Sequence, residues 1–299
     1  MKRTLAVIVI FIFFMALPVF SLELEIIGGI GNLAYDRNRT SSLGGTDGAF
    51  SPQLFPLALL RLSGEHDGLA FNAGLERDPI MHTRLFANVM VDMEYIIIEA
   101  GPTIGLLNSF ELLLNPGVSG SLKFQIPGKI FVQASGSSSL AFIRMEKTGN
   151  YSQYGGDAGL GFWVPYVICS LNTGISNFTV RERGNLLIED ELSRYFFRAD
   201  VFTKNVPYDI RVDLGYQSLR RSYISHKIEN NRIANDVQTD EFKSVFLGLE
   251  GIFTVNPSLR ILLGLEMPIY YWGVRPLQEP PKSTVFLEAR AGVIWTLPF

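Results

Sequence analysis

The charged residues whose spacing could support chemistry lie in the last third of the chain, at every second position of apolar stretches. In Tyr208–Ser218, Asp209, Arg211 and Asp213 alternate with apolar residues. Successive side chains of a β-strand point to opposite faces, so one face of such a strand is ionic and the other apolar. On the inner face of a barrel, ionic side chains of both signs would line an aqueous conduit and set its ion preference. The residues that we expect on this face are Arg198, Asp200, Asp209, Arg211, Asp213, Glu250, Arg260, Glu266, Glu288 and Arg290.

Other sequence motifs give no reason to expect catalysis or a bound cofactor. Gly29 to Ala34 reads GIGNLA and matches the dinucleotide fingerprint, but the residues after it form a polar loop and not the helix that such a site needs. The histidines His66, His82 and His226 lie far apart in turns or loops, without the spacing of metal ligands. His82 with Asp78 is the nearest approach to a hydrolytic pair. We therefore expect no enzyme activity, no metal and no cofactor.

The amino end has the pattern of a secretory signal peptide. Lys2 and Arg3 precede an apolar run, residues 5–20, and Val19-Phe20-Ser21 offers a cleavage site. A membrane-anchoring helix is a weaker interpretation, because charged residues follow at strand spacing. We predict a signal peptide over residues 1–21 and one mature domain over residues 22–299.

The composition favours a membrane protein built from strands. Hydrophobic residues make up 47% of the chain and charged residues 18%, yet after the amino end there is no run of about 18 uncharged apolar residues that could span a bilayer as a helix. An exported chain of this kind can still cross a membrane if its strands close into a barrel, because closure satisfies every backbone group. The net charge of −3 is too small to indicate a nucleic-acid partner.

From Leu22 onward, the chain consists of short segments in which polar and apolar residues alternate. Breaks separate these segments, and each short break is followed by a longer one. Short turns on one rim and long loops on the other are typical of transmembrane barrels. The segments predict an all-β fold, a closed antiparallel transmembrane barrel of fourteen strands, or of twelve if the chain makes no hairpin at Asp92. The predicted strands are Leu22–Asn32, Pro56–Leu62, Leu69–Glu76, Arg84–Val91, Ile96–Leu106, Pro116–Phe124, Ile130–Phe142, Tyr154–Val164, Val167–Val180, Tyr195–Lys204, Tyr208–Ser218, Phe242–Phe253, Leu259–Trp272 and Thr284–Phe299.

The last stretch, Thr284–Phe299, alternates apolar residues up to a terminal aromatic residue. In this it resembles the closing strand of bacterial outer-membrane β-barrel proteins. The resemblance implies that Phe299, Leu297 and Trp295 form a signal for the barrel assembly machinery. It also implies a chain exported to the outer membrane of a double-membraned bacterium, with outer-membrane lipid as a partner.

The side chains expected inside the barrel suggest its function and leave rival interpretations. Strands between residues 96 and 180 place many Gly and Ser residues inward, which should leave space for a passive channel for small solutes. Paired charges that plug the lumen are an alternative. A transporter of hydrophobic molecules, with an apolar pocket around Trp163, Phe196 and Phe246, is another, since the strand count resembles the long-chain fatty-acid transporter family. A third is a structural or recognition barrel that works through the loops Arg37–Gln53 and Tyr223–Glu241.

Overall fold

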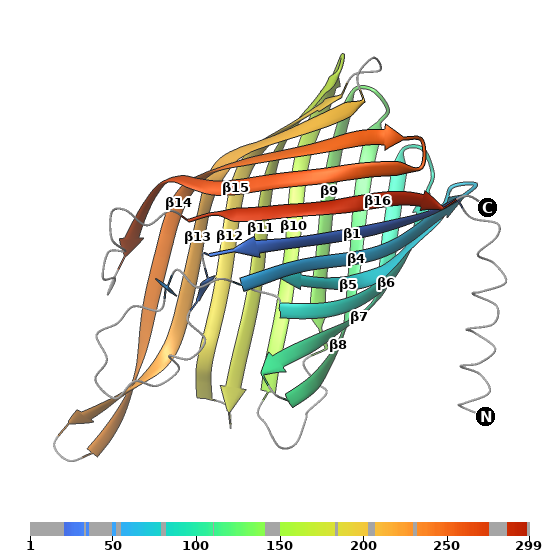
Figure 1. Ribbon diagram of the computed structural model, residues 1–299. Helices are drawn as coiled ribbons and strands as arrows, with labels where there is room; N and C mark the ends of the chain where they lie inside the picture. The colour runs from blue at the N-terminus through green and yellow to red at the C-terminus, as the bar shows by residue number, and fades with distance from the viewer. Residues whose placement is uncertain are drawn as a thin grey trace, which may run out of the picture.

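The computed structural model describes residues 21–32, 34–35, 50–51, 55–78, 82–109, 111–140, 150–182, 185–202, 207–229, 232–274 and 286–297. Within these ranges the chain forms a closed antiparallel barrel of fourteen strands and a separate two-stranded sheet (Figure 1). The predicted fold class and strand number are confirmed, including the hairpin at Asp92, where β6 pairs with β7. The predicted signal peptide lies outside the described residues, apart from Ser21.

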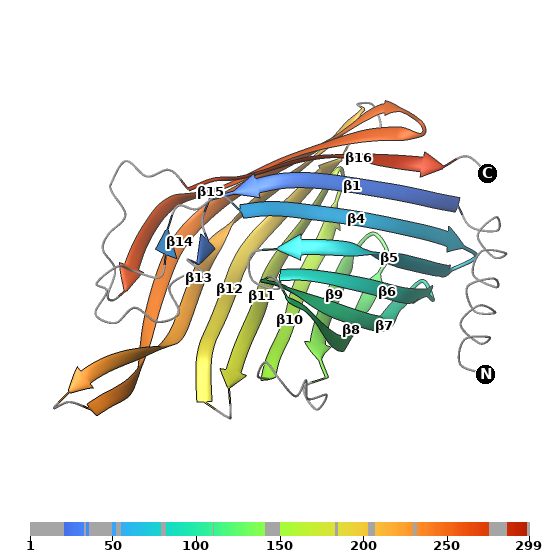
Figure 2. The ribbon, with the colours of Figure 1, turned by 60° about the horizontal axis from the view of Figure 1, so that its bottom comes forward.

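The wall consists of strands that each pair with both neighbours. Strand β1 lies between β16 and β4 and closes the barrel (Figure 2). The short pair β2 (Ala34–Tyr35) and β3 (Phe50–Ser51) lies in the segment between β1 and β4. The wall strands are β1 (Ser21–Gly31), β4 (Phe55–His66), β5 (Leu69–Asp78), β6 (His82–Asp92), β7 (Ile96–Ser109), β8 (Glu111–Ile126), β9 (Ile130–Ser139), β10 (Asn150–Val164), β11 (Val167–Glu182), β12 (Asn185–Phe202), β13 (Tyr208–Glu229), β14 (Arg232–Asn256), β15 (Leu259–Val274) and β16 (Glu288–Leu297).

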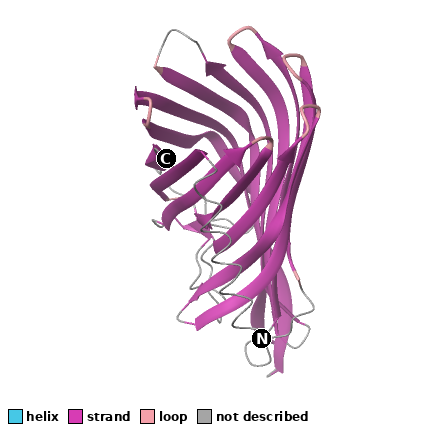
Figure 3. Cartoon of the chain, turned by 90° about the vertical axis from the view of Figure 1, so that its right-hand side faces the viewer, coloured by secondary structure: helices cyan, strands magenta, loops and turns pink. Residues whose placement is uncertain are grey.

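The short turns lie along one rim, shown in pink in Figure 3. Asp67 and Gly68 both have positive φ, which suits the two-residue hairpin between β4 and β5. Backbone hydrogen bonds join each of these turns to the next, beginning with the Asp92 amide, which donates to the Gly68 carbonyl at 2.7 Å. Leu22 pairs with Leu297, so the first and last strands begin and end on this same rim.

The outer surface of the barrel is apolar on every strand. Among the described residues, buried polar side chains outnumber buried apolar ones, which inverts the pattern of a water-soluble domain. An exterior of this kind is suited to acyl chains and not to water. One exposed apolar residue from each wall strand, in chain order, is Ile26, Leu60, Leu69, Val89, Ile98, Val118, Val132, Leu160, Leu171, Phe197, Leu214, Leu249, Leu263 and Val293.

Two segments predicted as long loops are mostly strand. Strand β12 already begins at Asn185, within the loop expected over Arg181–Ser193, and β13 and β14 continue pairing as far as Glu229 and Arg232. The β13–β14 hairpin therefore extends well beyond the neighbouring strands (Figure 1). Polar side chains occupy both faces of these extensions, since Asp190 and Arg221 are buried on the inner face and Arg220 is exposed on the outer face. The alternation of polar and apolar residues that marked the other strands is therefore missing. Of the loop expected over Arg37–Gln53, only Phe50 and Ser51 are described.

Period-two alternation from Leu259 would place Tyr271 on the apolar outer face, but a one-residue register shift in β15 turns it inward. The pairing with β14 shifts between Val245 and Phe246, where Pro268 interrupts the ladder. A shift of one residue moves each following side chain to the other face. Tyr271 consequently packs on Phe242 inside the barrel, at 5.5 Å between ring centroids, while Tyr270 is 66% exposed.

In the described part of the chain, no helix is long and apolar enough to cross a membrane.

Candidate functional site: the lumen

Contacts between strands that are not neighbours identify the inner face. Arg194 in β12 donates to Glu266 in β15 at 2.6 Å, although β13 and β14 lie between these strands. Adjacent strands are about 4.8 Å apart, so the backbones of β12 and β15 are separated by roughly 14 Å along the wall. Side chains can close this distance only on the concave side. The register of Arg194 and Glu266 therefore faces the lumen.

Five of the predicted ionic residues of β12, β13 and β14 form two neighbouring hydrogen-bonded groups on this face. Arg198 makes two hydrogen bonds to the Asp213 carboxylate, both at 2.8 Å. Arg211 donates to Asp200 at 2.6 Å and to Glu250 at 3.0 Å. Such charge-assisted bonds fix the guanidinium groups in place. The structure thus brings together five of the ten residues that the sequence placed on the ionic face.

The remaining predicted residues lie in three different settings. Glu266, Glu288 and Arg290 line a cavity of the lumen, and Arg290 Nε lies 3.9 Å from Glu250. Arg260 pairs with Glu23 of β1, past the intervening β16. Asp209 is exposed near the rim of turns, at the start of β13.

The proposed assembly signal lies at the end of the closing strand. Trp295 is 47% exposed on the outer surface, and Leu297 is the last residue of β16, paired with Leu22. Phe299 lies outside the described residues. These positions put the described part of the motif at the seam where the barrel closes, on the rim that carries the short turns.

Sequence reasoning missed several lumen residues, of which Arg194 is the most informative. It falls before the predicted start of its strand at Tyr195, so it was assigned to a loop. The signal was nevertheless present, because Arg194, Phe196 and Arg198 are spaced by two and share one face. The missed pair of Arg61 with Glu25 is on the inner face of β4 and β1.

The wall from β5 to β11 is polar, and its small Gly and Ser residues lie within residues 96–180, where the sequence predicted them. Glu99 accepts hydrogen bonds from Asn72 at 2.6 Å, from Asn88 at 2.8 Å and from Ser121 at 3.1 Å. Arg84 in β6 reaches Ser137 in β9 at 3.0 Å, again across two strands. A hollow of about 300 Å³ borders this wall and is lined by Ser, Gly, Asn and carboxylate groups. Hydroxyl and carboxylate groups of this kind keep the wall wet.

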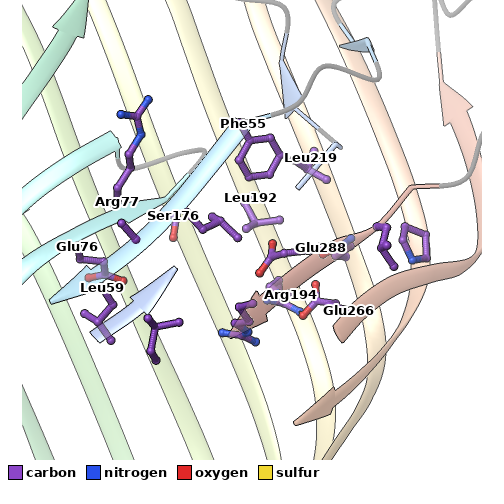
Figure 4. Close-up of a pocket in the computed structure, with 17 residues that line it drawn as sticks. Phe55, Leu59, Glu76, Arg77, Ser176, Leu192, Arg194, Leu219, Glu266 and Glu288 are labelled. Carbon is purple, nitrogen blue, oxygen red and sulfur yellow. The ribbon is translucent and has the colours of Figure 1, made fainter. Parts of the chain in front are cut away.

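A cavity of about 340 Å³, here called the lumen cavity, has lining residues from opposite walls. Aliphatic and ionic side chains are interspersed around it, with Arg194, Glu266 and Glu288 close together and Glu76 beside Leu59 (Figure 4). Strands β4 and β11 are seven places apart in the ring of fourteen, yet both contribute. The lumen therefore narrows at this level. The side chains that the argument below uses are Ile27, Leu57, Leu59, Leu192, Leu219, Arg194, Glu266, Glu288 and Arg290.

The aromatic side chains of the lumen form separate clusters. Trp163 packs against Phe131 with ring centroids 4.9 Å apart, near the rim of turns, where the Lys123 ammonium lies over both rings. Phe196 and Phe246 pack together on β12 and β14, further from that rim, and the Arg194 guanidinium lies 4.2 Å from the Phe246 centroid. The single apolar pocket expected around Trp163, Phe196 and Phe246 does not form, because Trp163 packs on Phe131 near the turns and the two phenylalanines pack on each other at a different level of the wall.

The ion pairs of the described residues run along the wall and not across it. The widest, Arg194 with Glu266, joins strands three places apart, whereas facing strands are seven places apart. Charges held in this way neutralise one another without filling the axis of the barrel.

Within the described ranges, no group of three His, Cys, Asp or Glu side chains is placed to hold a metal.

Comparison with solved structures found similar barrels at low sequence identity. In-vitro folded OmpT, an outer membrane protein of Vibrio cholerae, is similar over 93% of this chain and 97% of its own, with 7% identity and a TM-score of 0.45. A Pseudomonas aeruginosa FadL homologue is similar over 92% and 88%, with 11% identity and a TM-score of 0.46. A porin is similar over 92% and 100%, with 9% identity and a TM-score of 0.40. No protein-family model matches the sequence, and no curated protein is similar to it.

Proposed function

We propose that this protein is a passive channel that carries small solutes across the outer membrane of a double-membraned bacterium. The observation that carries the proposal is the course of the lumen ion pairs, which follow the wall and do not cross the axis of the barrel. Fourteen strands about 4.8 Å apart and tilted by roughly 40° would make a circular barrel about 28 Å across between backbones. Inward side chains take up part of that width, and the lumen cavity would be the narrow point.

The distribution of aromatic residues on the exterior supports the membrane location. Tyr195, Tyr216 and Trp272 contact one another in sequence on the outer face of β12 to β15. Tyr208 lies beside Phe253 at the rim of turns, with ring centroids 6.4 Å apart. Tyr208 and Tyr216 are eight positions apart in β13, about 26 Å of strand, which is close to the apolar band of about 25 Å in outer-membrane barrels.

The same geometry supports a proposal for the orientation and the partners. Short turns face the periplasm in outer-membrane barrels, so the rim with Asp67 and Gly68 would be periplasmic and the long β13–β14 hairpin extracellular. Outer-membrane lipid would cover the apolar exterior. The stretch from Trp295 to Phe299 would be presented to the assembly machinery from the periplasmic side.

A second candidate, a transporter of hydrophobic molecules, is favoured by one observation. Leucine and isoleucine side chains line the lumen cavity from both walls. A purely aqueous channel has no need of them at its narrowest level. The ionic groups of the same cavity distinguish this site from one built for a wholly apolar solute.

Single-channel recording tests the proposal. The mature chain, folded in detergent and added to a planar bilayer in KCl, should produce discrete current steps that persist at low voltage. The matched control is the same chain unfolded in denaturant and added at equal detergent concentration. A folded barrel that carries no current would overturn the channel function and leave the hydrophobic transporter as the better candidate.

A further inference from the structure

We propose that the lumen cavity is a binding subsite for zwitterionic solutes with an apolar body, of the size of apolar amino acids and short apolar peptides. This inference rests on the proposed channel function and names the solutes that the channel would favour. Small-molecule sites have volumes of roughly 300–1,000 Å³, and the cavity, at about 340 Å³, is at the lower end of that range. Its lining combines aliphatic side chains with a cluster of ionic ones, and each kind corresponds to one part of such a solute.

The aliphatic side chains of the cavity would hold the apolar body of the solute. Ile27 of β1 and Leu59 of β4 are cross-strand partners on the inner face, and Leu57 is two positions further along. From the other wall, Leu192 of β12 and Leu219 of β13 are also cross-strand partners, and Leu219 is buried. A slot with aliphatic side chains on both sides removes apolar surface from water, at roughly 25 cal/mol per Å² buried.

Two carboxylates at the edge of this slot would hold a cationic group. Glu266 of β15 and Glu288 of β16 are direct cross-strand partners that both line the cavity. Like charges at such positions repel each other. Arg194 relieves part of the repulsion, since it donates to Glu266 at 2.6 Å. An ammonium group placed between the carboxylates would lower the repulsion further and gain charge-assisted hydrogen bonds.

Arg290 would hold the carboxylate of the same solute. Glycines flank it in both neighbouring strands, at Gly29 and Gly264, and its side chain lies over Gly264 while remaining 38% exposed. Its nearest carboxylate, Glu250, lies at 3.9 Å and already accepts a hydrogen bond from Arg211 at 3.0 Å. Arg290 therefore keeps donors for an added carboxylate, which a guanidinium binds in a two-point geometry.

The spacing of the two charged groups matches the solute class. Arg290 and Glu288 are two positions apart on the inner face of β16, about 6.6 Å along the strand. One to two residues of extended peptide span about 3.5–7 Å, so the ammonium and carboxylate of an amino acid or dipeptide can reach both groups. The apolar side chains of the solute would then lie against the leucines.

Titration calorimetry on the detergent-folded protein tests the subsite without requiring conduction. Four probes separate its parts: leucyl-leucine, its amide, which lacks the anion, its N-acetyl derivative, which lacks the cation, and glycyl-glycine, which lacks the apolar body. Leucyl-leucine should bind at least about tenfold more tightly than the amide and the N-acetyl derivative, the factor expected for one lost charge-assisted bond. It should also bind more tightly than glycyl-glycine, which has no apolar side chains to bury.

Variants assign the preference to residues. Arg290→Gln should abolish the preference over the amide, and Glu288→Gln the preference over the N-acetyl derivative, while Lys129→Gln in a distant turn should leave both unchanged. Circular dichroism establishes that each variant is folded. Equal binding of the four probes, or tightest binding of the N-acetyl derivative, would overturn the proposal. KCl conductance is measured on the same preparations, so a channel that conducts without this discrimination refutes the subsite alone.

Discussion

Arg198 and Asp213 show how single residues hold the lumen wall. They come from adjacent strands, β12 and β13, and meet through two parallel hydrogen bonds at 2.8 Å. Asp213 is 8% exposed, so its carboxylate has exchanged most of its water for the guanidinium. Breaking one partner of such a pair costs more than the pair itself contributes, because the other charge stays buried.

Replacing Asp213 by Asn should therefore destabilise the barrel. We expect a loss of about 1–3 kcal/mol, the cost of a buried group left unsatisfied. Urea unfolding in micelles, followed by tryptophan fluorescence, measures it. Asp209→Asn is the matched control, since Asp209 is exposed at the start of the same strand and should change stability by less than about 0.5 kcal/mol. Equal stability of the two variants would contradict the role given to the pair.

Arg211 and Arg260 belong to two different ion-pair groups of the lumen, so their joint neutralisation tests the ionic lining. Arg211→Gln with Arg260→Gln removes two cations that pair with Asp200, Glu250 and Glu23, and leaves Glu250 with Arg290 at 3.9 Å. The excess of carboxylates should shift the channel toward cations. The reversal potential in a KCl gradient measures this, and the double Arg→Lys variant, which keeps the charge, should match the parent. An unchanged reversal potential in the Gln variant would refute the pore-lining role.

At the scale of elements, hairpin turns and bulges set which residues share a face. The β4–β5 hairpin depends on Gly68, whose φ is +76° and whose missing Cβ would lie 2.9 Å from the Asp92 carbonyl oxygen. That carbonyl belongs to the end of β6, beside the next turn. A side chain at Gly68 would thus strain its own turn and push the neighbouring strand at once.

Gly68→Ala should cost about 1–2 kcal/mol, because a left-handed conformation is disfavoured for a residue with a Cβ. The control is Gly28→Ala, since nothing lies within 4 Å of a Cβ built at Gly28 and its φ is not positive. Heat-modifiable mobility in gel electrophoresis gives the unfolding temperature of both. A loss of the same size at Gly28 would show that the effect comes from strand propensity and not from the turn.

At the scale of the whole molecule, the apolar exterior is the feature that suits the barrel to a membrane and not to water. Leu263 is 51% exposed in the middle of β15, and Val255 is 57% exposed close to the turn between β14 and β15. Both face away from the lumen, at different depths in the proposed bilayer. The two side chains are similarly exposed and differ in their depth in the proposed bilayer.

Leu263→Arg should therefore reduce the free energy of folding into lipid vesicles by about 2–4 kcal/mol, the cost of a cation near the bilayer midplane, whereas Val255→Arg at the interface should cost about 0–1 kcal/mol. Denaturant titration of vesicle-bound protein measures both. If the two substitutions were equally tolerated, the exterior would not be facing acyl chains.

Period-two alternation is a local property, so the sequence alone determined the strand number, the outward face of most strands and the common rim of the turns. A charge on the lipid face is costly, which makes the alternation strict wherever the wall crosses the membrane. Beyond the membrane this cost is absent, so the polar extensions of β12, β13 and β14 need not alternate. For this reason the sequence did not predict them as strands.

Only the tertiary structure decided what meets inside the barrel. The partner of Arg194 is 72 residues away in the chain, and Glu23 and Arg260 are 237 apart. Closure of the wall brings such residues together through strand order and stagger, which no local pattern encodes. The register shift at Pro268, which turns Tyr271 inward, and the pairing of Glu266 with Glu288 arise in the same way, since both depend on how neighbouring strands align.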